Sequence, residues 1–307
     1  MSAAGTQARA SRLDATAMLL MVGLTMSWGL NSVAAKVGLT GFNPILLCVL
    51  RSAIAGVAVL GWCRFRRIPV FGRDRTLWAG IAAGILFGLE FTLIFLSLDY
   101  TSVARSVLLT NTMPFWVLVG AHLLLDERMS LAKLAGVCLA FGGVALVFSD
   151  RLNAPGPDAW IGDLMALMAG LSWGLTTLVV RRSPLAHATP EKVLLYQLTV
   201  SAIVVSPLMP LGGALLREVG PVSIAALAFQ SLFIAAFTYV LWFGLVKRYP
   251  AAALSSFAVL TPVFGVLLAG ILLAEPLSAG IIASLVLIAA GLMLVNRPSP
   301  ERKQTHA

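Results

Sequence analysis

The chain has 307 residues, of which 59% are hydrophobic and 11% are charged, against about 25% charged residues in soluble domains. A soluble domain of this length would need a more polar surface, so the composition excludes that class. The formal net charge of +9 does not indicate a nucleic-acid partner, because the positive residues stand at the ends of apolar runs and form no basic patch interleaved with aromatic residues. We expect an all-α polytopic protein whose surroundings are the lipid bilayer.

Apolar runs near twenty residues long recur along the whole chain, and each can cross ~30 Å of hydrocarbon as a helix that satisfies its own backbone. The predicted spans are 15–39, 43–63, 76–98, 102–122, 131–149, 161–181, 190–211, 222–246, 251–273 and 277–296. The first run is too long for the core of a signal peptide and is expected to remain as the first helix. Pro114, Pro207 and Pro262 fall within spans and predict kinks there.

The distribution of Lys and Arg predicts the orientation. With the N-terminus inside, seventeen of these residues fall on the cytoplasmic side and four on the outer side, with Arg51 left within a span. This bias predicts a multi-pass protein of the bacterial inner membrane with both termini in the cytoplasm.

The two halves of the sequence repeat each other. Ser27-Trp28-Gly29-Leu30 returns as Ser172-Trp173-Gly174-Leu175, and Pro114 and Glu127 find counterparts in Pro262 and Glu275. Since five spans per copy is an odd number, the second copy must lie inverted in the membrane. The predicted division is a tail at 1–14, a first five-helix repeat at 15–149, a connecting loop at 150–160, a second five-helix repeat at 161–296 and a tail at 297–307.

Inverted repeats are typical of carriers that bind substrate near the midplane and open alternately to each side by rocking one bundle against the other. The sequence also resembles the drug/metabolite transporter superfamily, in its EamA-type branch, over nearly all its length. The resemblance lies in the two Ser-Trp-Gly-Leu motifs, the basic residues Lys36 and Arg181, and the paired Pro-to-Glu patterns. It implies ten helices and an exporter of amino acids, including aromatic ones, of other metabolites or of drugs.

The candidate substrate site combines aromatic and polar side chains from several spans. Glu90 is the one acid deep within a span, so it is a candidate proton carrier or partner of a substrate ammonium group, with a purely structural hydrogen bond as the alternative. Trp28 with Asn31, and Trp173 with Thr177, share helix faces that could line a cavity. The full set of predicted substrate-binding residues is Trp28, Asn31, Glu90, Phe91, Asn111, Trp173, Thr177, Tyr239, Trp242 and Ser256.

Three basic residues are candidates for gating or ion pairing. Arg51 lies inside a span and could contact a substrate carboxylate or a structural partner. Lys36 and Arg181 stand at helix ends, where they could form gate salt bridges or only reach toward the interface.

The sequence predicts no enzyme, cofactor or metal site. It contains no nucleotide-binding loop, no metal-like cluster and no Ser-His-Asp spacing, and Cys48, Cys63 and Cys138 have no paired spacing. The expected partners are a small-molecule substrate and lipid, with a monomer or a dimer both open. The main alternative function is that of a multidrug efflux carrier, and the further alternatives are those of a channel or a lipid scramblase.

Overall fold

The computed structural model describes residues 14–72, 74–125, 129–150, 155–249, 254 and 256–295. Within these ranges every regular element is a helix, and the one strand-like pairing is an isolated bridge between Phe42 and Leu216. Eight described segments of 19–24 residues are long and apolar enough to cross a membrane, and two shorter ones cover 257–273 and 279–295. The predicted all-α fold with ten transmembrane helices is confirmed.

The elements agree with the predicted spans, several of which are divided. The long helices are α1 (Ala15–Gly38), α2 (Pro44–Phe65), α3 (Leu77–Tyr100), α6 (Leu131–Ser149), α7 (Ala159–Arg182), α8 (Pro190–Val205) and α13 (Ala279–Val295). The divided spans comprise α4 (Val103–Thr110) with α5 (Met113–Leu125), α9 (Pro221–Ala228) with the π-helix η3 (Phe229–Thr238) and α10 (Tyr239–Arg248), and the short 3-10 helix η4 (Ser256–Val259) with α12 (Leu260–Leu273).

The prolines explain part of this division. Pro114 lies just after the Asn111–Thr112 turn that separates α4 from α5, and Pro207 lies where α8 gives way to the 3-10 helix η2 (Ser206–Gly212). Because proline has no N–H and clashes with the preceding turn, it ends a helix or begins one more readily than it continues one. At these two positions the chain breaks instead of kinking, whereas Pro262 stands in the first turn of α12.

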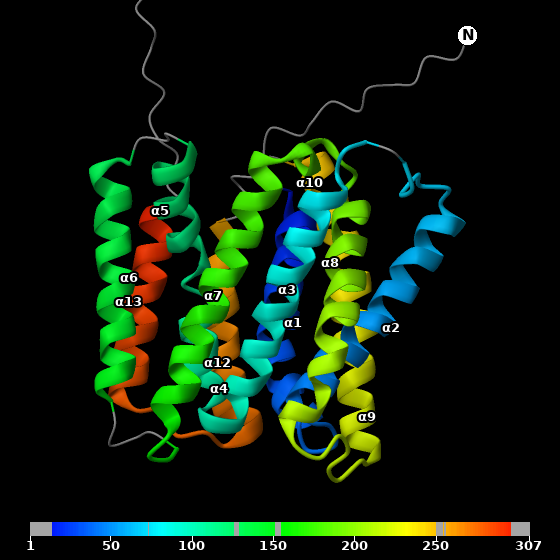
Figure 1. Cartoon of the computed structure of the whole chain (residues 1–307). Helices are drawn as coiled ribbons and strands as arrows, with labels where there is room; N and C mark the ends of the chain where they lie inside the picture. Colours follow the sequence, from blue (N-terminus) through cyan, green and yellow to red (C-terminus); the bar gives the residue numbers. More distant parts are fainter. Residues whose placement is uncertain are drawn as a thin grey trace, which may run out of the picture.

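The helices of the two halves interleave (Figure 1). Helices α6 and α13 pack together along their length at one edge, while α3 packs on both α7 and α8, and α1 packs on α12. We call the end of the bundle where α1 and α3 finish and where α4 and α7 begin the distal end, at the bottom of Figure 1, and the opposite end the proximal end.

The glycines of the two Ser-Trp-Gly-Leu motifs mark equivalent helix crossings. A Cβ atom at Gly29 of α1 would lie 2.7 Å from the backbone nitrogen of Gly265 in α12, and one at Gly174 of α7 would lie 2.8 Å from the Cβ of Trp116 in α5. Small residues let helices approach this closely in a membrane. In each half, the first span therefore crosses the fourth span of the other half at the glycine of this motif.

The outer surface of the bundle is apolar. Large side chains such as Leu131 and Ile271 are 85% and 75% exposed, while charged side chains such as Arg51 and Glu90 are buried inside. A surface of this kind suits hydrocarbon, and polar groups inside a membrane face the bundle interior or a cavity. The polar interior therefore holds the candidate site.

Candidate functional site

A cavity of about 410 Å³ lies among the spans of both halves. Helices α1, α2, α3, α4 and α5 contribute to its lining from the first half, and α7, η3, α10, η4, α12 and α13 contribute from the second. Its volume falls in the range of small-molecule sites, about 300–1,000 Å³.

Aromatic rings form much of the cavity wall. The five lining rings are Trp28, Phe91, Trp173, Tyr239 and Trp242. The indoles of Trp28 and Trp242 meet edge to face with their centroids 5.7 Å apart, and Trp28 Nε1 donates to Thr238 Oγ1 at 3.0 Å. Thr238 is the last residue of η3, so the π-helix fixes the orientation of this indole.

Three polar side chains of the lining carry buried atoms without a hydrogen-bond partner among the described residues: Asn31 Oδ1, Arg51 Nε and Nη1, and Glu90 Oε2. Arg51 and Glu90 are only 1% and 3% exposed. The Arg51 guanidinium lies 3.8 Å from the centroid of the Phe91 ring, which holds it by a cation–π contact. Buried polar groups are normally paired, so these atoms are suited to a ligand.

The structure brings most of the sequence-predicted substrate residues together. Trp28, Asn31, Glu90, Phe91, Asn111, Trp173, Tyr239 and Trp242 all line the cavity. Asn111 also donates from Nδ2 to the carbonyl of Val107 at 2.8 Å, in the last turn of α4. Their part in substrate binding stays a prediction.

Two predicted substrate residues stand apart from this group. Thr177 is not part of the lining, and its hydroxyl donates to the carbonyl of Trp173 at 3.1 Å. The side chain of Ser256 lies outside the described residues, although its backbone begins η4.

The three predicted gating residues occupy different environments. Arg51 lines the cavity. Lys36, in the last turn of α1, donates from Nζ to the carbonyl oxygen of Leu98 at the distal end. Arg181 lies in the last turn of α7, at the proximal end, outside the cavity lining.

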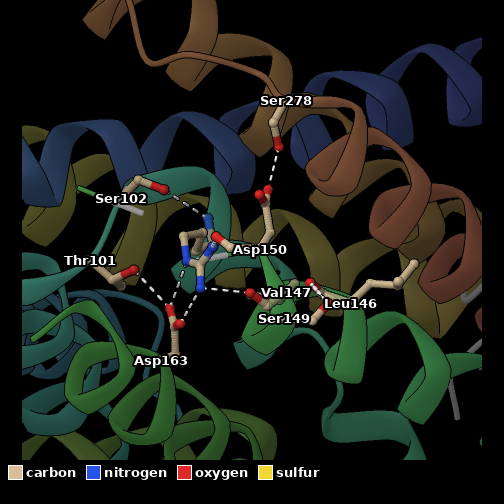
Figure 2. Close-up of polar contacts among 9 residues, drawn as sticks. Thr101, Ser102, Leu146, Val147, Ser149, Asp150, Asp163 and Ser278 are labelled. Atoms are coloured by element: carbon tan, nitrogen blue, oxygen red, sulfur yellow. Dashed lines mark hydrogen bonds and ion pairs between the residues drawn. The ribbon is translucent and has the colours of Figure 1, made fainter. Parts of the chain in front are cut away.

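A buried charged cluster at the distal end, shown in Figure 2, was not among the predicted residues. Arg105 of α4 forms a bidentate ion pair with Asp163 of α7. The distance from Nη2 to Oδ2 is 2.5 Å and that from Nε to Oδ1 is 3.1 Å. Both residues lie near the start of predicted spans that begin on the same side of the membrane. That shared position is the signal by which the pair could have been recognised.

At the proximal end, Asp74 pairs with Lys192 of α8 at 2.6 Å and accepts a hydrogen bond from the Thr76 hydroxyl, also at 2.6 Å. The hydrogen bond from Lys192, then that from Thr76, lowers the pKa of Asp74 to about 2. This contact connects α8 to the loop before α3. Among the described residues no group of His, Cys, Asp and Glu side chains could hold a metal ion.

Comparison with known proteins gives a family match over both halves. The model of the EamA-like transporter family matches residues 15–149 and again residues 160–297. Two proteins named probable amino-acid metabolite efflux pumps, from Salmonella typhimurium and Escherichia coli, are 27% and 28% identical to this chain, in each case over 92% of this chain and 95% of the other.

Further similarities are consistent with that match. The uncharacterized transporter YoaV of Bacillus subtilis is 25% identical over 90% of this chain and 95% of its own length. One solved crystal structure superposes with a TM-score of 0.64 at 21% identity, covering 92% of this chain and 96% of the other. This last similarity concerns the fold alone.

Proposed function

Because the chain belongs to the EamA-like transporter family, we propose that this membrane transporter exports amino acids of broad specificity, including aromatic ones, by alternating access. The observation that carries the proposal is the pair Arg51 and Glu90, which border an aromatic-walled cavity with buried atoms that have no hydrogen-bond partner in the described part of the chain. The family is one of transporters, so no enzymatic reaction is assigned.

A zwitterion matches the charges of this cavity. The Arg51 guanidinium offers N–H donors to a carboxylate, which it can hold by charge-assisted bonds. The Glu90 carboxylate and the Asn31 carbonyl oxygen are acceptors for an ammonium group. The rings of Trp28, Trp173 and Trp242 then face the rest of the substrate, where an aromatic side chain gains most from ring packing.

The proposed cycle uses the two-repeat architecture. A site between inverted repeats can be exposed to either side by a rocking motion that exchanges the conformations of the halves. From the excess of Lys and Arg on one side of the predicted spans, we place the protein in the inner membrane with both termini in the cytoplasm. In this orientation the distal end faces outward.

The proposal is tested by uptake of radiolabelled tryptophan, phenylalanine and serine into liposomes that contain the purified protein, against empty liposomes, with and without an imposed pH gradient. Saturable uptake that excess unlabelled amino acid suppresses would support it. No uptake above empty liposomes, with the protein folded by circular dichroism, would remove the amino-acid assignment.

A second candidate is efflux of hydrophobic cations. It is favoured by Glu90 beside several aromatic rings, since a desolvated cation binds well between a carboxylate and ring faces. Ethidium efflux from the same liposomes, without amino-acid uptake, would select this alternative.

A further inference from the structure

Charged residues hold α4 of the first half to the second half at the distal end of the bundle, and we infer that these contacts of α4 form the distal gate of the transport cycle, with Arg105, Asp163 and Glu275 as its positioning residues. The inference rests on the proposed function in one respect: a carrier must open this end, whereas a protein that does not transport has no need to. None of the three residues touches the proposed substrate cavity.

The gate is built around α4, a separate helix of eight residues, Val103–Thr110, all of them buried. The Asn111–Thr112 turn and Pro114 divide it from α5, so α4 can move without bending a continuous helix. Ser106, Val107 and Thr110 line the cavity. The first turn of α4 therefore stands between the cavity and the distal end.

The first contact holds the beginning of α4. The carboxylate of Glu275, in the segment between α12 and α13, accepts hydrogen bonds from the backbone N–H groups of Val103 at 2.8 Å and Ala104 at 3.0 Å. These are two of the N–H groups that a helix leaves unsatisfied in its first turn, where a negative charge is also favoured by the helix dipole. The second half of the chain thus supplies a further capping group to a helix of the first half, in addition to its own N-cap residue Ser102.

The second contact is the ion pair of Figure 2. Besides its two bonds to Asp163, Arg105 donates from Nη1 to the carbonyl of Asp150 at 3.1 Å and from Nη2 to that of Val147 at 2.6 Å, while Thr101 donates to Asp163 at 2.7 Å. Arg105 ties α4 to α7 and to the end of α6. The side chains of the pair are 3% and 1% exposed.

The energetics of such a pair suit a gate better than a permanent joint. The desolvation cost of a buried ion pair roughly cancels its attraction, so exchanging the pair for two hydrated ions changes the free energy little. Removing one partner has a larger effect on the free energy, because the remaining charge is then buried without its counter-charge. This cost arises only in the closed state, since the remaining charge is hydrated when the gate is open. A neutral substitution should therefore shift the protein toward the distally open state.

Other contacts in the bundle provide contrasts. The packing of α6 on α13 depends on small residues, because a Cβ added at Gly291 would lie only 2.6 Å from the carbonyl oxygen of Gly136. Such close packing suits a static seam. Arg217 and Asp99 form an ion pair at 2.6 Å that also lies distally, but their side chains are 34% and 28% exposed and belong to neither α4 nor α7. This exposed pair supplies a matched control.

The experiment measures access to the cavity directly. Ser106→Cys is introduced together with Cys138→Ser, which removes the exposed native cysteine; Cys48 and Cys63 are buried. A membrane-impermeant cationic methanethiosulfonate is applied to right-side-out vesicles, and inside-out vesicles give the rate from the other face. Asp163→Asn and Glu275→Gln should each raise the labelling rate from the distal face by about tenfold, because each weakens only the closed state. Asp99→Asn should leave the rate unchanged.

Equal labelling in the parent, Asp163→Asn and Glu275→Gln proteins would overturn the gate, and so would an equal rise in Asp99→Asn. If Asp163→Asn fails to fold, Glu275→Gln decides alone, since it keeps the side-chain size and one acceptor oxygen. The assay needs no substrate. Faster labelling without amino-acid uptake would keep the gate and remove the proposed substrate, whereas normal uptake with unchanged labelling would remove the gate alone.

Discussion

Replacing Arg51 by glutamine should weaken binding of substrates that carry a carboxylate. In the structure Nε and Nη1 of Arg51 have no hydrogen-bond partner among the described residues, and the side chain borders the cavity. A hydrogen bond to a charged group contributes about 1.5–3 kcal/mol. Loss of one such bond should therefore raise the half-saturating concentration of tryptophan by about 10- to 100-fold.

The assay is tryptophan uptake into liposomes, with tryptamine as a competitor that has the same ring and ammonium group but no carboxylate. Tryptamine should inhibit tryptophan uptake equally well in wild type and Arg51→Gln, because it has no carboxylate that could bind the guanidinium. Arg66→Gln is the control, since it removes the same charge from an exposed residue at the end of α2. An unchanged half-saturating concentration for tryptophan, or an equal loss for tryptophan and tryptamine, would refute the role given to Arg51.

Three further predictions concern other parts of the molecule. Glu90→Gln should slow uptake driven by substrate or by a pH gradient, because it removes the only acidic group among the described residues that line the cavity. Unchanged uptake at every pH would exclude a proton role. Gly29→Leu should destabilise the protein by about 1–3 kcal/mol through overpacking, measured by thermal unfolding in detergent, whereas Gly23→Leu on the same helix should not, since no atom lies within 4 Å of a Cβ there. Asp74→Asn should lower the unfolding temperature at pH 7 by removing the contact with Lys192. Because the pKa of Asp74 in the folded protein is lowered to about 2, the stabilisation by its carboxylate is fully present above the ordinary pKa of 3.8 and is lost as the pH falls toward 2. The difference in unfolding temperature between wild type and Asp74→Asn should therefore shrink toward pH 2. A difference that persisted at pH 2 would contradict this prediction.

The spans and the main aromatic and charged cavity residues were predictable because each leaves a local mark in the sequence. An acid such as Glu90 in an otherwise apolar run stands out by its cost in lipid, and the paired Ser-Trp-Gly-Leu motifs locate equivalent depths in two helices. These features require only the length of a span and its composition.

Other features depend on rotation and contact between helices, which the sequence does not state. Thr177 shares a helical face with Trp173 by spacing, but the rotation of α7 leaves it outside the lining, and its hydroxyl bonds back to its own helix. Arg105 and Asp163 meet across 58 residues. Their shared position near the start of two spans is compatible with a pair, but the contact itself depends on how α4 and α7 pack, so it had to be found in three dimensions.

The π-helix η3 makes the two halves unequal. The third span of the first half is α3, a regular helix of 24 residues, whereas its counterpart is divided into segments of 8, 10 and 10 residues with the π-helix in the middle. If the two halves were identical and exchanged their conformations during the proposed transport cycle, the state open to one side and the state open to the other would have the same free energy. In the proposed transport cycle, the π-helix of the second half, which has no counterpart in α3, removes that degeneracy, so the empty protein should prefer one of the two states when no gradient is present.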